Sequence, residues 1–195
     1  MRLIRAAEMR DAAAIAHVHV QSWITTYNGI VPQVYLAALD EVERIPLWQD
    51  WLKRDISVFV AEVDGQIVGF SAGGAIREPL QEYEAELYTL YLLKQVQGLG
   101  IGKALFRAVT GALVTKGYQS MLVWVLEQKP AVHFYEKLSG QYVMSKRIEI
   151  SGLELSEFAL GWKNLAAEPA KVSRFLGGEH AFRCGYSSAT SVKVR

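Results

Sequence analysis

The spacing of apolar and polar positions predicts helices in the first part of the chain. Residues 2–7 can start a strand, and Asp11 is placed to cap a helix that continues to about Thr26. Apolar side chains recur every three or four positions in this helix, and again between residues 47 and 55. With a short helical region between them, three small helices are expected before the first long strands.

A β-hairpin is predicted after these helices. Its first strand, 57–63, is short and rich in β-branched residues, which favours a strand over a helix. Asp64-Gly65 is suited to the two left-handed positions of a type I′ turn, so residues 67–70 are expected to return as the second strand. A loop that contains Pro79 is expected next.

Strands and helices alternate in the second half of the chain. The mostly apolar run 84–92 is typical of a buried strand, and after a glycine-rich turn an amphipathic helix continues until Gly117. Residues 119–126 indicate a second buried strand, and a further helix is expected to begin at Pro130. Two last strands complete an α/β (α+β) pattern, at about 142–150 and 153–162.

Composition indicates one globular domain with an extension. The chain has 195 residues, 51% apolar and 21% charged, which is enough to bury a core without disulfide bonds. The periodic pattern ends near Ala167, and the last 28 residues hold five basic and two acidic side chains. Residues 1–167 are therefore expected to form the domain. Residues 168–195 are expected to be a solvated extension that the chemistry does not need, with a basic arm or an interface as the alternative.

Charge and cysteine content argue against several classes of protein. A net charge of +1 gives no overall attraction to nucleic acid or to an anionic membrane. The single cysteine, Cys184, cannot form an internal disulfide or a multi-thiolate metal site, which suits the cytoplasm. Residues 12–39 carry no charge, but polar residues and Pro32 interrupt them, so no membrane helix is expected. The charged N-terminus lacks the apolar run of a signal peptide.

The segment from Gln97 to Ala104 is the strongest functional motif in the chain. Glycines before a helix expose backbone N–H groups and let a ligand approach, and the helix dipole favours an anion there. The spacing excludes a Walker loop, which needs glycine at position 97 and a hydroxyl at 104, and the Rossmann pattern G-x-G-x-x-G. It fits Gln/Arg-x-x-Gly-x-Gly/Ala through Gln97, Gly100 and Gly102. A tight turn without a ligand is the alternative.

Two separated signatures resemble the GNAT superfamily of acetyl-CoA-dependent N-acetyltransferases, its bacterial members in particular. The first is the glycine-rich loop with the strand before it, and the second is residues 123–138 followed by Gly140. The resemblance covers about residues 2–163. It implies the GNAT fold, which is a mixed central sheet of about six to seven strands flanked by helices. A splayed central strand would form the acyl-CoA cleft.

The resemblance implies that acetyl-CoA is the co-substrate and that no metal takes part. The pyrophosphate of the co-substrate would lie on the glycine-rich loop. The residues expected to bind it are Leu90, Tyr91, Leu92, Gln97, Gly98, Leu99, Gly100, Ile101, Gly102, Lys103 and Lys129. Lys129 departs from the family pattern, which usually has Asn at this position. It either reaches a CoA phosphate, weakens the site, or is a solvated residue at the start of a helix.

Acetyl transfer to an amine requires a base, because an alkylamine has a pKa of about 10 and is protonated at pH 7. Glu86 matches the position where many family members carry a glutamate that acts directly or through water, and Glu84, on the same sheet face, is the fallback. Tyr135 matches the tyrosine that protonates the leaving thiolate in many relatives. A backbone N–H near Leu92 would stabilise the oxyanion. The structural alternatives are a solvated carboxylate for the glutamates and a packing aromatic for the tyrosine.

The acceptor is the least defined part of the predicted reaction. In the family the first helix and the loop after it line the acceptor side, which nominates Trp23, Tyr27 and Asn28, although core packing explains Trp23 equally well. The expected function is transfer of an acetyl group to a primary amine, in a small molecule or at a protein α-amine, by direct attack in a ternary complex. A homodimer is compatible with it. The alternative is a non-catalytic acyl-CoA sensor or partner-binding domain with the same fold.

Overall fold

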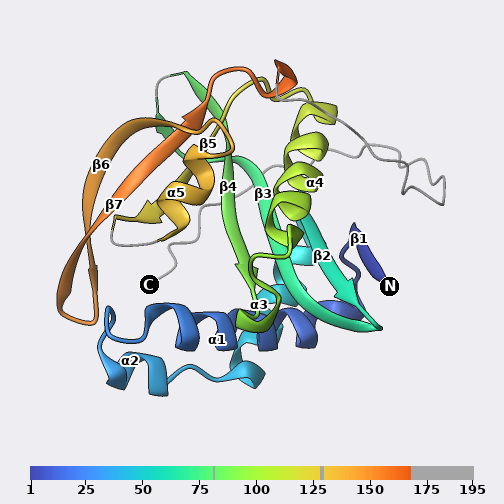
Figure 1. Cartoon of the computed structure of the whole chain (residues 1–195), viewed down its shortest axis with the longest axis vertical. Helices are drawn as coiled ribbons and strands as arrows, with labels where there is room; N and C mark the ends of the chain where they lie inside the picture. The colour runs from blue at the N-terminus through green and yellow to red at the C-terminus, as the bar shows by residue number, and fades with distance from the viewer. Residues whose placement is uncertain (81, 128–129, 168–195) are drawn as a thin grey trace.

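Seven strands form one sheet in the order β1-β2-β3-β4-β5-β7-β6 in the computed structural model, which describes residues 1–80, 82–127 and 130–167 (Figure 1). β4 and β5 are parallel, and the other neighbouring strands are antiparallel. The α+β class and the mixed sheet predicted from the sequence are confirmed. The strands are β1 (Arg2–Ala6), β2 (Ser57–Val63), β3 (Gln66–Leu80), β4 (Tyr83–Leu92), β5 (Met121–Leu126), β6 (Gln141–Ile150) and β7 (Leu153–Trp162).

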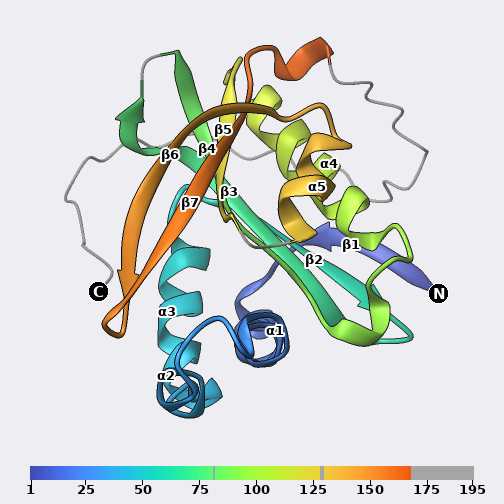
Figure 2. The ribbon, with the colours of Figure 1, turned by 60° about the vertical axis from the view of Figure 1, so that its left-hand side comes forward.

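Helices cover both faces of the sheet, as the turned view shows (Figure 2). Ile15, Trp48 and Phe70 belong to an apolar core between the sheet and the first helices, and Val109 and Leu113 belong to a second core under the later ones. The three small helices expected at the start of the chain are confirmed. The helices are α1 (Ala12–Tyr27), α2 (Gln33–Ala37), α3 (Glu41–Lys53), α4 (Ile101–Thr115) and α5 (Pro130–Glu136), with short 3-10 turns at η1 (Met9–Asp11), η2 (Lys94–Val96) and η3 (Leu165–Ala167).

Turns and helix ends follow the local sequence signals. Asp64 and Gly65 have φ angles of 50° and 81°, the left-handed pair that a type I′ turn requires. Gly117 has a φ of 94° just after α4, where its N–H and that of the next residue bond back to carbonyl oxygens of the last helical turn. The predicted hairpin and the predicted end of α4 are both confirmed.

β3 is longer than the sequence predicted. The sequence analysis expected Pro79 to lie in a loop. In the structure Pro79 lies inside β3, which ends at Leu80. The ladder between β3 and β4 is interrupted between Ala75 and Leu80. Proline has no backbone N–H group, and at position 79 this costs no hydrogen bond of that ladder. The longer strand carries Arg77, which the sequence analysis had assigned to a loop, to a position beside Glu86 of β4.

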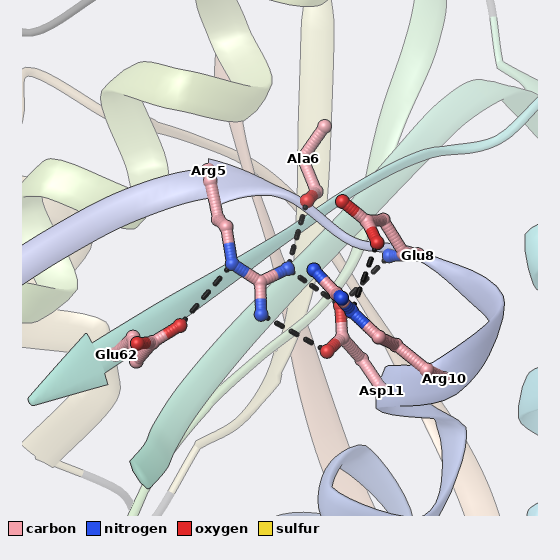
Figure 3. Close-up of polar contacts among 6 residues, drawn as sticks. All are labelled: Arg5, Ala6, Glu8, Arg10, Asp11 and Glu62. Carbon is pink, nitrogen blue, oxygen red and sulfur yellow. Dashed lines mark hydrogen bonds and ion pairs between the residues drawn. The ribbon is translucent and has the colours of Figure 1, made fainter. Parts of the chain in front are cut away.

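Asp11 holds the start of α1 in a different way from the predicted cap. α1 begins directly after Asp11, but the Asp11 carboxylate accepts no hydrogen bond from the first turn of α1. It accepts the N–H of Glu8 at 2.7 Å and two bonds from the guanidinium of Arg5 at 2.6 and 3.0 Å (Figure 3). Arg5 also bonds Glu62 on β2 at 3.2 Å. Burial raises the pKa of Asp11, but the bonds from Arg5 and Glu8 outweigh this effect, so the pKa is lowered and the carboxylate stays ionised.

β4 and β5 pair over a short stretch and then separate. Their ladder has three residue pairs, the last of which joins Leu87 to Val123. At the same point β4 contains a bulge, in which Tyr88 is the extra residue opposite β3. The two strands therefore part beyond Leu87 and leave an opening in the middle of the sheet, as expected for a splayed central strand.

Two parts of the sequence analysis lie outside the described residues. These are Lys129 and the extension 168–195, whose expected roles stay predictions. Within the described ranges, none of the helices combines the length and the apolar character needed to cross a membrane.

Candidate active site

A cavity of about 750 Å³ lies where β4 and β5 separate. Its lining comes from both faces of the sheet, so the opening between the strands connects two chemically different regions. We call the region around the start of α4 the loop end, lined by Gln97, Gly98, Gly100, Gly102 and Lys103. We call the opposite region the polar end, lined by Arg77, Glu86, Tyr88, Trp124, Lys146 and Glu157.

The loop end has the geometry of an anion site. Gly98 and Gly100 have φ angles of 75° and 81°, which the absence of a side chain allows. Gly100 is the N-cap of α4, and Ala104 is the first residue whose N–H bonds back to the Gly100 carbonyl, at 3.2 Å. The N–H groups of the first helical turn are therefore free for a ligand, no acidic residue lies in that turn, and Lys94 lines the cavity beside it.

Leu99 and Ile101 of the predicted loop site do not line the cavity. Leu99 is 48% exposed, and its carbonyl accepts a bond from Arg2 at 3.3 Å, whereas Ile101 is buried in the apolar core. Leu90, Tyr91 and Leu92, which were also predicted, do line the cavity from β4.

The edge of β4 that faces the opening carries unused hydrogen-bonding capacity. Beyond Leu87 this edge has no strand partner among the described residues. Thr89 lines the cavity, and its buried hydroxyl has no hydrogen-bond partner in the part of the chain that the structure describes. A buried polar atom of this kind costs free energy unless a ligand or water satisfies it.

Tyr135 lies on α5 beside the opening and is 4% exposed. Its ring packs among Phe106, Phe134 and Trp162. Burial raises the pKa of Tyr135 well above its ordinary value, and the nearby Tyr91 raises it further. The hydroxyl is therefore protonated at neutral pH and can act as a proton donor.

Aromatic residues from α1 line the middle of the cavity. The indole N–H of Trp23 donates to the hydroxyl of Tyr91 at 3.0 Å, and the hydroxyls of Tyr91 and Tyr27 hydrogen-bond each other. The rings of Trp23 and Tyr27 lie 4.4 Å apart between centroids. Trp23 and Tyr27 thus line the cavity, and their role towards the acceptor stays a prediction, whereas Asn28 follows the end of α1 and is not part of the lining.

Glu86 is 2% exposed and forms an ion pair with Arg77 that engages both carboxylate oxygens. The Nε of Arg77 lies 3.1 Å from one oxygen, the backbone N–H of Arg77 lies 3.3 Å from the same oxygen, and Nη2 bonds the other. Burial would lower the pKa of Arg77, but the bonds and charge of Glu86 outweigh it and raise that pKa. Glu84 does not line the cavity, and its carboxylate accepts the N–H of Gln119 at 2.7 Å.

The polar end contains residues that the sequence analysis did not identify. Lys146 on β6 lies opposite Glu157 on β7, and its Nζ lies 4.0 Å from the centroid of the Trp124 ring. Tyr88 lies under Arg77, and burial raises the pKa of Tyr88 to about 12. No local motif marks these positions, because they come from separate strands and meet only through the register of the sheet.

No group of three or more His, Cys, Asp or Glu side chains lies together as a candidate metal site within residues 1–80, 82–127 and 130–167. The polar end is instead built from two cations and two carboxylates, with aromatic rings beside them. Chemistry at this cavity can thus draw on proton transfer and on backbone or cationic stabilisation of negative charge.

The chain is similar to known proteins of one family. Residues 20–140 match the model of the acetyltransferase (GNAT) family. The chain is 40% identical over 177 residues to an uncharacterized N-acetyltransferase of Bacillus subtilis (strain 168), YuaI, and the match covers 89% of this chain and 100% of the relative.

Two solved structures share the fold. The paia N-acetyltransferase of Thermoplasma acidophilum, in complex with coenzyme A, has a TM-score of 0.64 and 23% identity, over 83% of this chain and 98% of that chain. The yncA structure from Salmonella typhimurium, with its cofactor acetyl-CoA, has a TM-score of 0.68 and 19% identity, over 89% of this chain and 99% of that chain.

Proposed function

This chain belongs to the GNAT family of acetyltransferases, and we propose that it transfers the acetyl group of acetyl-CoA to a primary amine by direct attack in a ternary complex. Its relatives support assignment as an N-acetyltransferase. The observation that carries the proposal is the single cavity that joins the glycine-rich loop, the buried Tyr135 and the polar end through the opening between β4 and β5.

The loop end suits the phosphates of the acetyl donor. The free N–H groups of the first turn of α4 and the positive end of the helix dipole favour an anion, and Lys94 and Lys103 add positive charge beside them. The amide-bearing arm of CoA would then extend along the open edge of β4, where Thr89 offers a hydroxyl without a partner in the described residues. This path leads from the loop towards Tyr135.

Tyr135 is proposed to protonate the sulfur as the thioester breaks. Its hydroxyl keeps its proton at neutral pH because burial raises its pKa, so it is a donor in every resting enzyme molecule. A backbone N–H of β4 near Leu92 is proposed to stabilise the oxyanion that forms when the amine attacks the carbonyl carbon. The amine approaches from the side of Trp23 and Tyr27, which line the same cavity.

Incubation with acetyl-CoA alone tests direct attack. If the amine attacks the thioester itself, intact-mass measurement should find no acetyl group attached at the active site before an amine is added, because no enzyme nucleophile takes part. Heat-unfolded protein under the same conditions controls for spontaneous acetylation of lysines. An acetyl group that appears on the folded protein only, and disappears when an amine is added, would contradict direct attack and indicate a covalent intermediate.

A further inference from the structure

We propose that Glu157, and not Glu86, accepts the proton of the acceptor amine in the acetyl transfer proposed above. The proposal deepens the proposed function and depends on it. Glu157 lines the polar end of the cavity, and in the described part of the chain its carboxylate makes no ion pair and no hydrogen bond. Glu86 lines the same cavity, but Arg77 engages both of its oxygens.

The ion pair with Arg77 makes Glu86 a poor proton acceptor. A proton on Glu86 would have to displace a charge-assisted bond from Arg77. It would also leave the Arg77 cation without its partner at a carboxylate whose side chain is 3% exposed, where an unpaired charge is costly. Glu86 is therefore a positioning residue, which holds Arg77 and the polar end in place.

The register of the sheet aims Glu157 at the opening. On one side Glu157 pairs with Lys146 of β6, and on the other with Leu126 of β5, the strand that forms one edge of the opening. Because side chains alternate along a strand, Glu157 shares its face with Trp124, which is two residues before Leu126 and also lines the cavity. Glu157 thus lies between Leu126 of β5 and Lys146 of β6 across the sheet, and it lines the cavity.

The charge of Glu157 acts on groups from several elements around the cavity. These groups are Arg77 of β3, Glu86 and Tyr91 of β4, Lys146 of β6 and Tyr27 of α1. Tyr27 and Tyr91 also interact electrostatically with Tyr135 of α5. The proposed base and the proposed acid therefore both interact electrostatically with this pair of tyrosines, and both line the same cavity.

The surroundings of Glu157 also suit a base at neutral pH. Burial raises the pKa of Glu157, the charges of Lys146 and Arg77 offset this effect in part, and Glu86 adds to it. A carboxylate with a raised pKa takes up a proton more readily than an ordinary surface glutamate.

The proton balance of the reaction is complete with these two residues. Glu157 takes one proton from the ammonium form of the acceptor and leaves a neutral amine, whose lone pair forms the new C–N bond. The C–S bond breaks with its electron pair on sulfur, and the thiolate takes the proton of Tyr135. The second proton of the attacking nitrogen passes through solvent to restore Tyr135. Glu157 then releases its proton to solvent, so the products are an amide, a thiol and one proton.

Comparison of two amines tests the role of Glu157. Benzylamine is protonated at pH 7 and needs a base, whereas aniline is already neutral and does not. The Glu157→Gln variant should lose about a hundredfold or more in kcat/KM with benzylamine, the usual size of a general-base contribution, and little with aniline. Acetyl-CoA affinity, measured by calorimetry, should be unchanged. Glu149→Gln is the matched control, because it removes one exposed carboxylate from the same hairpin outside the cavity.

The same comparison separates Glu157 from Glu86. Glu86→Gln should slow both amines by a similar factor, because a positioning residue does not respond to the protonation of the amine. A loss confined to benzylamine in Glu86→Gln, or an equal loss with both amines in Glu157→Gln, would overturn the proposal. If wild-type protein acetylates neither probe, the amine that it acetylates fastest replaces benzylamine, and activity with no amine at all refutes the proposed function.

A titration that needs no turnover tests the placement of Glu157 by itself. The carboxyl carbon signals of ¹³C-labelled glutamate are followed against pH in wild-type protein and in Glu157→Gln. The signal missing from the variant should titrate above the ordinary glutamate pKa of about 4.3. A midpoint at or below that value would show an exposed or ion-paired carboxylate and would overturn the proposal.

Discussion

The Tyr135→Phe variant should turn over at least about a hundredfold more slowly than the wild type, or about 2.7 kcal/mol in activation free energy, with acetyl-CoA affinity almost unchanged. The substitution keeps the ring, which packs among Phe106, Phe134 and Trp162, and removes only the hydroxyl. Because burial keeps this hydroxyl protonated, its loss removes the donor for the departing thiolate. Steady-state kinetics and calorimetry together measure the two quantities.

Tyr83→Phe provides the matched control, because Tyr83 is a buried tyrosine on β4 that does not line the cavity. Its kinetics should resemble those of the wild type. An acetyl thioester of a more acidic thiol should restore much of the rate of Tyr135→Phe, since such a thiolate leaves without a proton. Nearly unchanged kinetics in Tyr135→Phe would assign the residue to packing alone, and a loss confined to acetyl-CoA affinity would assign its hydroxyl to binding.

The Gly100→Val variant should bind acetyl-CoA at least about tenfold more weakly, a loss of about 1.4 kcal/mol. Gly100 has a φ of 81°, which a β-branched residue adopts only with strain, so the loop and its N–H groups would shift. A Cβ at this position meets no protein atom within 4 Å, so the new side chain would extend into space that the phosphates are proposed to occupy. Calorimetry with acetyl-CoA measures the change.

Gly117→Val separates this effect from backbone strain. Gly117 lies at the other end of α4, has a φ of 94° and also has open space around a Cβ, but it does not line the cavity. Both variants should lose stability to thermal unfolding, and only Gly100→Val should lose affinity. Equal affinity in the two folded variants would refute the placement of the phosphates on this loop.

Local signals predicted most of the fold, and the errors have local causes. Asp64-Gly65 and Gly117 determine the backbone around them, so the hairpin and the end of α4 could be predicted from a few residues. Pro79 misled the prediction, because an interruption of the β3 ladder that tolerates proline depends on the partner strand. Asp11 misled it as well, because Arg5 and Glu8 use the carboxylate that a cap would need.

Some residues of the site could be predicted from short motifs, and others depend on contacts between segments that are distant in the sequence. The loop around Gly100 and the position of Tyr135 follow from motifs of a few consecutive residues, and the structure brings both to one cavity. Glu86 could be located from the sequence, but its partner Arg77 could not, because the β3 prediction ended too early. Lys146 and Glu157 pair across the two-residue turn of the β6–β7 hairpin, but the sequence did not show that this pair lines the cavity, which depends on how the hairpin packs beside β5.

Thiol release from acetyl-CoA, measured over a panel of primary amines, tests most directly that this protein is an acetyl-CoA-dependent N-acetyltransferase. The panel contains alkylamines, aromatic amines, amino acids, polyamines and peptides with a free α-amine, and mass spectrometry measures the acetylated amine. We expect thiol release that depends on the amine for at least one class, with one acetylated amine formed for each thiol. Acetyl-CoA binding by calorimetry without thiol release, with every amine of the panel, would contradict catalysis and indicate a protein that binds the thioester without using it.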